Sequence, residues 1–462
     1  MRVGSLALGL LALAILGGLA LRPGRPGDPG SGADKRCAGV LTILSPHWEG
    51  VREEVERVYN EERTARGELP VRFDWLDVGG TSDIIRYIRS SFLNRPEGIG
   101  VDLLFGGGTD PYLALKKEGL LEKCDLPAEL LDSIGKDCAG VPVLDQEGFW
   151  YGVGLSGFGI IYNKVILKKL GVKEPVSWSD LAKGECYSWI ASADPRKSGS
   201  VFMMYEIIVQ SFGWEKGMEV ISAMSGNTRS FSGNAGSIPK DVALGEAAFG
   251  LCIDVYALNA VMDAGEDRLG FILPPGETVI TPDAIALLKG APEKELARDF
   301  IIFNLSEKGQ KLWSFFPGTD PDAPKEHALL KMSVCPYMYE KYPAAAMLKA
   351  SPFKMPVKFH YDLRAAADRM NIFRDYLGIL FVDHREDCAK AWKAVLDSPE
   401  DEGKRRLFFA HPVSSSEQFR ELGRGDYTNS RIRAKLQTEW SNDAGSRYKK
   451  ILSDQNTQGQ TK

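Results

Sequence analysis

Apolar and polar residues follow two rhythms over the first part of the chain and predict strands and helices in turn. Residues 39–44 are a short apolar run, and residues 71–75 alternate apolar and polar side chains as a half-buried strand does. Between these two strands, one helix face is predicted by Val51, Val55, Val58 and Tyr59. A second helix is expected from a cap at Thr81 or Ser82.

A third strand, residues 101–105, ends in the glycine-rich segment 106–109, and Asp110 and Pro111 are expected to cap and open the next helix. This alternation predicts an open parallel sheet with helices on both faces. Ligands bind such sheets at the carboxyl ends of the strands.

A second α/β series follows an extended glycine-rich run at residues 150–163. The pattern predicts further strands at 187–191, 249–255, 269–273 and 280–288, and helices at 178–181, 200–212 and 293–313, with another capped by Ser237. The tail from residue 324 is charged and predicted to be mostly helical.

Composition narrows the function classes. The chain has 462 residues, enough for two to four domains, and 44% of them are hydrophobic, which is typical of a globular protein. With 57 basic and 62 acidic residues its net charge is −5, which argues against general nucleic-acid binding. The five histidines have no zinc-ligand spacing, so we expect no metal and no cofactor.

The N-terminus indicates export. Residues 3–21 carry no charge, and the Pro- and Gly-rich residues 22–32 cannot continue a helix. We predict a signal peptide plus linker over residues 1–37; a retained membrane anchor is the alternative. Both place the body in the periplasm or outside the cell. Export permits disulfides, and a Cys124–Cys138 bridge is the first expectation, although buried free thiols would serve as well.

Two glycine-rich motifs are candidates for nucleotide or anion binding. Gly152 to Gly157 matches G-x-G-x-x-G, but the segment continues as a predicted strand, so an extended crossover is favoured over a dinucleotide site. Residues 106–109 lack the Gly-Lys of a P-loop, yet their backbone N–H groups could hold an anion. No catalytic triad, carboxylate pair or metal cluster emerges, so we expect no enzyme.

The turn Ser198-Gly199-Ser200 precedes an amphipathic helix, so it either cradles an oxyanion or simply caps the helix. Asn227 lies in a Gly/Ser/Asn loop and is either a ligand contact or a turn former. Asp254 and Tyr256 follow a predicted strand, where a carboxylate contacts a ligand or caps a loop.

Four segments together resemble the extracellular solute-binding proteins of ABC importers. They are YGVGLSGFGIIYNK with the downstream SWSDL, then ADPRKSGSV, LGEAAFGLCIDVYA, and ITPDAIALLKGAPEKELARDFIIFNLSEKGQKLW, and they cover roughly residues 39–318. The resemblance is to the type II periplasmic binding proteins, in the branch that binds iron, phosphonates and sugar phosphates.

The resemblance implies an α/β fold of two lobes joined by two crossover strands, with a mostly helical C-terminal extension. The expected boundaries are 39–155 with 272–330 for lobe 1, 156–271 for lobe 2 and 331–462 for the extension. It also implies a ligand site made of Ser45, Gly107, Gly108, Thr109, Ser156, Ser198, Gly199, Ser200, Asn227, Asp254 and Tyr256.

The function implied is capture of a small, oxyanion-bearing ligand by hinge closure, followed by docking of a monomer on ABC permease subunits in the membrane. Iron is disfavoured, because Ala257 and Leu258 follow Tyr256 where the iron binders carry adjacent tyrosines. Two alternatives stay open: a membrane-tethered ligand sensor or scaffold on the same fold, and an exported enzyme that uses the cleft.

Overall fold

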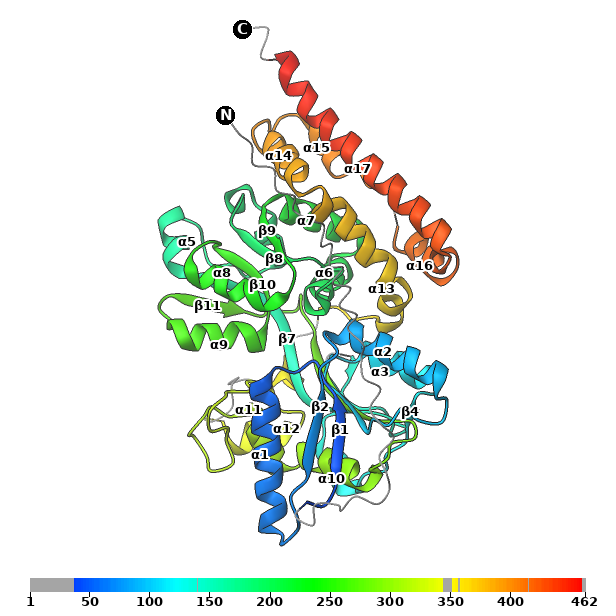
Figure 1. The fold of residues 1–462 in the computed structure, drawn as a ribbon. Coiled ribbons are helices and arrows are strands. Elements are labelled where there is room, and N and C mark those ends of the chain that lie inside the picture. Colours follow the sequence, from blue (N-terminus) through cyan, green and yellow to red (C-terminus); the bar gives the residue numbers. More distant parts are fainter. Residues whose placement is uncertain (1–36, 139, 344–350, 356–357, 414, 459–462) are drawn as a thin grey trace, which may run out of the picture.

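One long strand, β7 (Tyr151–Asn163), connects the two lobes of the protein (Figure 1). This computed structural model describes residues 37–462 except 139, 344–350, 356–357, 414 and 459–462. Every residue of β7 is buried. Its first half pairs with β12 (Ile280–Leu288), and its second half pairs with β10 (Phe249–Ile253) and β11 (Leu269–Ile272). The predicted two-lobed α/β fold is confirmed.

Lobe 1 is built on a mixed sheet with the strand order β2-β1-β3-β12-β7. The strands β1 (Val40–Leu44), β2 (Arg72–Leu76) and β3 (Leu103–Phe105) are parallel, as the strand–helix alternation predicts. However, β12 runs antiparallel to its neighbours β3 and β7, because β7 leaves lobe 1 for lobe 2 and β12 returns from it. The helices of this lobe are α1 (Glu49–Ala65), α2 (Thr81–Asn94), α3 (Asp110–Lys117), α4 (Ala128–Ser133), α10 (Lys294–Leu305) and α11 (Glu307–Ser314).

Lobe 2 continues the same sheet through β10, β8 (Ile190–Ala193) and β9 (Thr228–Ser232). Its helices are α5 (Lys164–Leu170), α6 (Gly199–Phe212), α7 (Trp214–Gly226), α8 (Ile238–Leu244) and α9 (Asp254–Ala264). The helices α6 and α9 begin at the carboxyl ends of β8 and β10, which brings the predicted ligand-binding turns to the side of this lobe that faces lobe 1.

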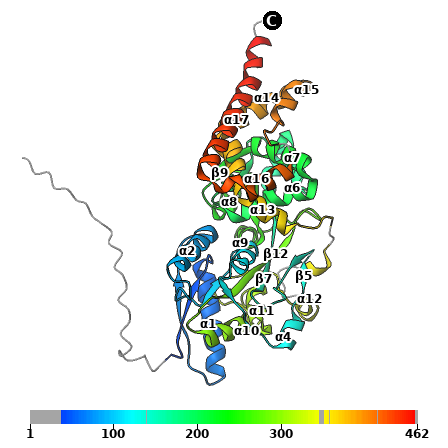
Figure 2. The same ribbon diagram turned by 90° about the vertical axis from the view of Figure 1, so that its right-hand side faces the viewer.

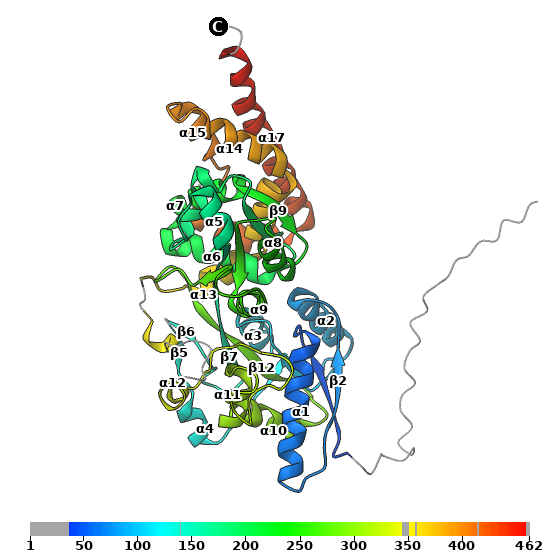
Figure 3. The ribbon, with the colours of Figure 1, turned by 90° about the vertical axis from the view of Figure 1, so that its left-hand side faces the viewer.

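The C-terminal extension is helical, as predicted, and packs on lobe 2; residues 385–408 lie at the end away from lobe 1, whereas residues 363–377 reach the boundary with lobe 1 (Figures 2 and 3). After α12 (Pro336–Lys341), which packs on lobe 1, it comprises α13 (Leu363–Leu377), α14 (Arg385–Leu396), α15 (Glu402–Phe408), α16 (Ser416–Arg424) and α17 (Ser430–Gln458). Its apolar side chains share one buried core with lobe 2, from Phe202 and Ile208 to Phe373 and Trp392.

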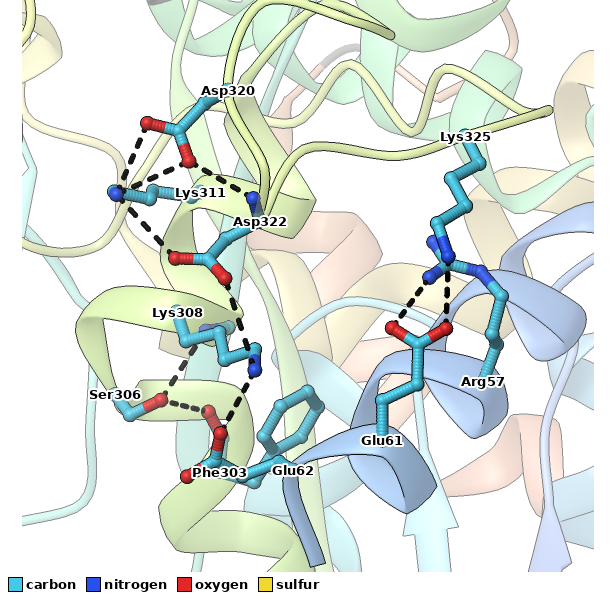
Figure 4. Close-up of polar contacts among 11 residues, drawn as sticks. Arg57, Glu61, Glu62, Phe303, Ser306, Lys308, Lys311, Asp320, Asp322 and Lys325 are labelled. Atoms are coloured by element: carbon cyan, nitrogen blue, oxygen red, sulfur yellow. Dashed lines mark hydrogen bonds and ion pairs between the residues drawn. The ribbon is translucent and has the colours of Figure 1, made fainter. Parts of the chain in front are cut away.

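A return segment, residues 315–335, runs back across lobe 1 and is held there by ion pairs (Figure 4). Lys325 pairs with Glu61 of α1 at 2.9 Å, Lys311 pairs with Asp320 at 3.1 Å, and Lys308 bridges Glu62 and Asp322. The segment then adds one β-bridge, Met332 to Leu155 of β7. This anchoring fixes the position of the residue before Met332, Lys331, whose backbone N–H donates to Trp313 O.

Several local predictions are wrong. The single helix expected over residues 293–313 is two helices, because Ser306 accepts from Gly309 N–H as the N-cap of α11. Gly80 caps α2, instead of Thr81 or Ser82, and Thr109 caps α3, which therefore begins at Asp110. The strand ending at residue 255 stops at Ile253, and the helix expected at 178–181 is a 3₁₀ turn.

The disulfide expectation is also wrong. The described residues include all seven cysteines and contain no disulfide; Cys124 and Cys138 are separate thiols. Both pack in the apolar core of lobe 1, and burial raises the pKa of Cys124 to about 11 and that of Cys138 to about 12. They act as small hydrophobic side chains. The predicted signal peptide lies outside the described residues, and no helix among those described is long and apolar enough to cross a membrane.

Candidate functional site

A buried polar network occupies the junction of the two lobes. Ser156 lies at the middle of β7, opposite Thr281 of β12, and Asp283 follows two residues later on β12. Lys331 of the return segment donates from Nζ to Ser156 Oγ at 3.1 Å and forms an ion pair with Asp283 Oδ2 at 2.9 Å. Gly154 permits this approach, because a Cβ there would lie 3.0 Å from Lys331 Cβ.

The network extends to the carboxyl end of β1. His47 Nε2 lies 2.7 Å from Asp283 Oδ2, and His47 Nδ1 lies 3.0 Å from Ser45 Oγ. Burial alone would raise the pKa of Asp283, but the charge of Lys331 and the contact with His47 hold it far below the usual range. Asp283 is therefore a permanent carboxylate that fixes Lys331 as an ammonium group, whose pKa is raised.

Ser45, His47 and Asp283 have the composition of a catalytic triad but not its accessibility. Ser45 is 1% exposed, and its Oγ already accepts the backbone N–H of His47 at 3.1 Å. Asp283 is also shared with Lys331, whereas a triad aspartate orients only its histidine. The arrangement is a turn at the end of β1 that orients Asp283.

Asp254 opens α9 directly beside this network. Its Oδ2 accepts the Gly157 N–H of β7 at 2.7 Å, and its Oδ1 accepts Val255 N–H at 2.7 Å. Burial raises the pKa of Asp254 to about 7, although the Gly157 hydrogen bond and the charge of Lys331 oppose the rise. Two residues on, Tyr256 is 38% exposed on lobe 2.

The glycine-rich loop at the end of β3 contacts the same network. Gly106, Gly107 and Gly108 all have positive φ, from +81° to +100°, so each position favours glycine. Gly107 N–H donates to Asp283 Oδ1 at 3.0 Å. Thr109 is 4% exposed, and its Oγ1 finds no hydrogen-bond partner among the described residues. The loop therefore carries a hydroxyl that is not committed to the fold.

The turn Ser198-Gly199-Ser200 begins α6. Ser198 Oγ accepts Val201 N–H at 3.3 Å as the N-cap and lies 3.3 Å from Ser200 Oγ. Gly199 is exposed, so the first turn of the helix presents backbone N–H groups at its positive end. Capping and anion binding are compatible here, because the cap uses only one of the donors.

Asn227 lies elsewhere. It is fully buried at the end of α7, where its Nδ2 donates to Leu181 O and Lys183 O and its Oδ1 accepts Trp392 Nε1 at 2.7 Å. Its amide nitrogen holds the 181–183 turn of lobe 2 and its amide oxygen binds the extension, so Asn227 has a structural role in place of a ligand contact.

A hollow of about 530 Å³ borders His47 at the carboxyl ends of β1 and β2. Aromatic side chains line it together with four carboxylates and one arginine. These lining residues are Trp48, Trp75, Glu49, Glu53, Glu56, Asp77 and Arg52. This acidic lining disfavours an anion. No group of three or more metal-ligating side chains occurs within the described parts of the chain.

Sequence reasoning missed Asp283 and Lys331, and it singled out Ser45 at the end of β1 without a role for its neighbour His47. Asp283 lies within an otherwise apolar strand, ITPDAIALL, where a buried charge is costly unless paired. That cost was the available signal. The partner of Asp283 was not visible, because His47 is 236 residues away and Lys331 lies in a segment without periodicity.

Comparison with known proteins identifies a family. Residues 102–333, about half of the chain, match the bacterial extracellular solute-binding protein family. A curated relative is the phosphoglycerate transport regulatory protein PgtC of Salmonella typhimurium, 29% identical over 160 residues, which are 35% of this chain. The matched part spans 39% of the length of PgtC.

Solved structures share the fold at low identity. AfuA, a periplasmic binding protein from Actinobacillus pleuropneumoniae solved with fructose-6-phosphate bound, is 20% identical with a TM-score of 0.54, covering 77% of this chain and 98% of AfuA. The substrate-binding protein of an ABC transporter from Agrobacterium tumefaciens is 18% identical with a TM-score of 0.54, covering 74% and 95%. The chain therefore belongs to the bacterial extracellular solute-binding protein family and has its two-lobed fold.

Proposed function

We propose that this protein captures a small phosphate- or carboxylate-bearing solute between its two lobes and delivers it to the permease of an ABC importer. The observation that carries the proposal is Lys331, an ammonium group held in the lobe junction. Its Nζ has three N–H donors, and Asp283 and Ser156 engage two of them. The third is available to an oxyanion.

Other donors support an anionic ligand. The exposed Gly199 begins the positive end of α6, and Thr109 carries an uncommitted hydroxyl in the loop that Asp283 orients. Below about pH 7, Asp254 is protonated and adds no negative charge next to Lys331. A few such donors in a water-poor site select one charged group strongly, because an analogue without it leaves them unpaired.

The relatives point to the same chemical class. PgtC is named for phosphoglycerate transport, and AfuA was solved with fructose-6-phosphate bound. Phosphoglycerate and fructose 6-phosphate are both phosphate esters of small organic molecules. The family assignment supports binding with lobe closure rather than bond making, and the A. tumefaciens structure is described as part of an ABC transporter.

The test is calorimetric titration of the full chain with 3-phosphoglycerate, fructose 6-phosphate, inorganic phosphate, ferric citrate and unphosphorylated fructose. We expect micromolar or tighter binding of one phosphate ester and none of fructose. Lys331→Gln should weaken that binding at least tenfold. Lys325→Gln is the matched control, since Lys325 lies on the same segment and pairs only at the surface with Glu61.

Thermal unfolding of both variants shows whether they fold. If a folded Lys331→Gln binds the phosphate ester as tightly as the unchanged protein, Lys331 is not a ligand contact. If fructose binds as well as its phosphate, the anionic class is wrong.

A sensor function is the second candidate, because PgtC is named as a regulatory protein. A sensor would bind the same solute but stay tethered. Intact mass of the protein isolated from bacterial membranes separates the two: a retained residue 1–21 segment favours the sensor, and its removal favours the importer.

A further inference from the structure

The helical extension brings one arginine, Arg374 of α13, to the interface between the lobes. The extension and lobe 2 form one packed unit here: Phe373 lies 6.0 Å from Phe202 and 5.3 Å from Trp214, ring centre to ring centre. One turn earlier in α13, Arg369 makes a buried ion pair with Glu206 of α6. The backbone position of Arg374 is therefore fixed relative to α6.

The side chain of Arg374 lies between the first turns of two helices. Its guanidinium is 4.6 Å above the ring of Phe202, and its Nη2 is the nearest atom, at 4.0 Å, to a Cβ placed on Gly199. Across the lobe boundary, its Nη1 donates to Ser82 Oγ of α2 at 3.4 Å. The guanidinium thus borders both the Ser198–Ser200 turn of lobe 2 and the start of α2 in lobe 1.

Most of the hydrogen-bonding capacity of this guanidinium is unused. Its Nε is buried and has no partner among the described residues, and no carboxylate oxygen of those residues lies within 4.0 Å of it. Asp110 and Asp375 act on it only through space. Burial lowers the pKa of Arg374, and only the through-space charges of Asp110 and Asp375 oppose this.

The loop that precedes Asp110 joins this arginine to the lysine network. Gly107 binds Asp283 through its N–H, Thr109 has the uncommitted hydroxyl, and Asp110 interacts electrostatically with Arg374. An arginine with free N–H groups beside a helix N-terminus recognises phosphate or carboxylate in a planar, two-bond geometry.

We propose that Arg374 is a ligand-binding residue of the interlobe site, supplied by the C-terminal extension, and that it binds the phosphate or carboxylate group of the solute. This rests on the proposed function and gives the extension a role in it. The contact with Ser82 adds a second consequence: an anion held by Arg374 lies at the boundary that lobe closure brings together.

The test compares four single variants of the full chain by calorimetry with 3-phosphoglycerate, fructose 6-phosphate and inorganic phosphate. Arg374→Met should weaken binding of the preferred probe at least tenfold, and Arg374→Lys should recover part of the loss. Ser82→Ala should change binding less than twofold. Arg406→Met is the matched control, because Arg406 is an exposed arginine on α15 of the same extension.

Each outcome separates the two proposals. If the unchanged protein binds a probe and folded Arg374→Met binds it equally well, the role of Arg374 is refuted while the proposed function stands. If Ser82→Ala loses as much affinity as Arg374→Met, the arginine is a latch between lobes and not a ligand contact. If the unchanged protein binds none of the three anions, the anionic ligand class and the role of Arg374 are both wrong.

Discussion

At the scale of single residues, Asp254 is fully buried, and its carboxyl group forms no ion pair with the nearby ammonium group of Lys331. Its two oxygens accept backbone N–H groups, while Lys331 forms its ion pair with Asp283. The Asp254 carboxyl group therefore loses its proton at a higher pH than an ordinary aspartate does. A neutral Asp254 at acidic and near-neutral pH leaves the network with one cation and one anion, Lys331 and Asp283.

The raised pKa has a consequence for stability. Below about pH 4 the Asp254 carboxyl is protonated both folded and unfolded. Between pH 4 and 7 the unfolded chain loses this proton while the folded protein keeps it, so the folded state loses stability as pH rises. With a folded pKa of about 7 against 3.8, the full penalty above pH 7 is about 4 kcal/mol.

We therefore expect Asp254→Asn to be more stable than the unchanged protein at pH 8 and equal to it at pH 4. The asparagine amide oxygen can still accept Gly157 N–H, so the substitution removes the charge and keeps this hydrogen bond. Urea unfolding at pH 4, 6 and 8 measures the difference in stability. Two parallel stability curves would mean that Asp254 ionises normally in the folded protein.

At the scale of elements, the glycines of β7 let neighbouring backbone pack closely against this strand. Glycines in a crossover between lobes could serve as a hinge. In the structure, a Cβ at Gly159 would lie 2.1 Å from Ile272 O of β11, and one at Gly152 would lie 2.6 Å from Val143 O. Neighbouring backbone approaches the strand at these positions. The glycines let β7 be buried along its whole length, whatever motion it also permits.

Gly159→Ala should therefore destabilise the protein by about 1–3 kcal/mol, because the backbone of β11 must move to admit the methyl group. Gly233→Ala is the control, since a Cβ there meets nothing within 4 Å. Unfolding free energies in urea compare them. An unchanged Gly159→Ala would show that β11 yields freely, and would restore a flexible crossover.

At the scale of the whole molecule, lobe 2 and the extension share one buried core, so we expect them to unfold together. The link between them includes Glu206 and Arg369, whose side chains are 0% and 4% exposed. Breaking a buried pair leaves an uncompensated charge, whereas replacing both partners removes it. The same interface positions Arg374, so its integrity bears on the proposed site.

We expect Arg369→Met to cost about 3–5 kcal/mol of unfolding free energy and to release the extension to proteases together with lobe 2. Adding Glu206→Gln should recover much of the loss. Arg424→Met, which removes an exposed pair with Asp368, should cost no more than about 1 kcal/mol. If the extension of Arg369→Met unfolds alone, with lobe 2 intact, the two are separate units.

The sequence determined the elements and the family. The spacing of apolar residues predicts β1, β2 and β12 to within a residue or so and the buried face of α1, and the four family segments predict the two lobes. The lobe boundaries and the signal peptide stay predictions. Helix ends shifted by a residue or two, and residues 293–313 divided at Ser306, because capping depends on local hydrogen bonds that hydrophobic spacing does not encode.

Tertiary structure alone decided the site. Of the predicted ligand residues, it placed Ser45, Ser156, Asp254 and the 106–109 loop around one network and assigned Asn227 to the fold. It also supplied Lys331, His47 and Arg374 from segments far apart in sequence. The ion-pair partner of a charged residue cannot be identified from one sequence, because it depends on which distant segments come into contact. Here β7, β12 and the return segment come together only in the folded chain.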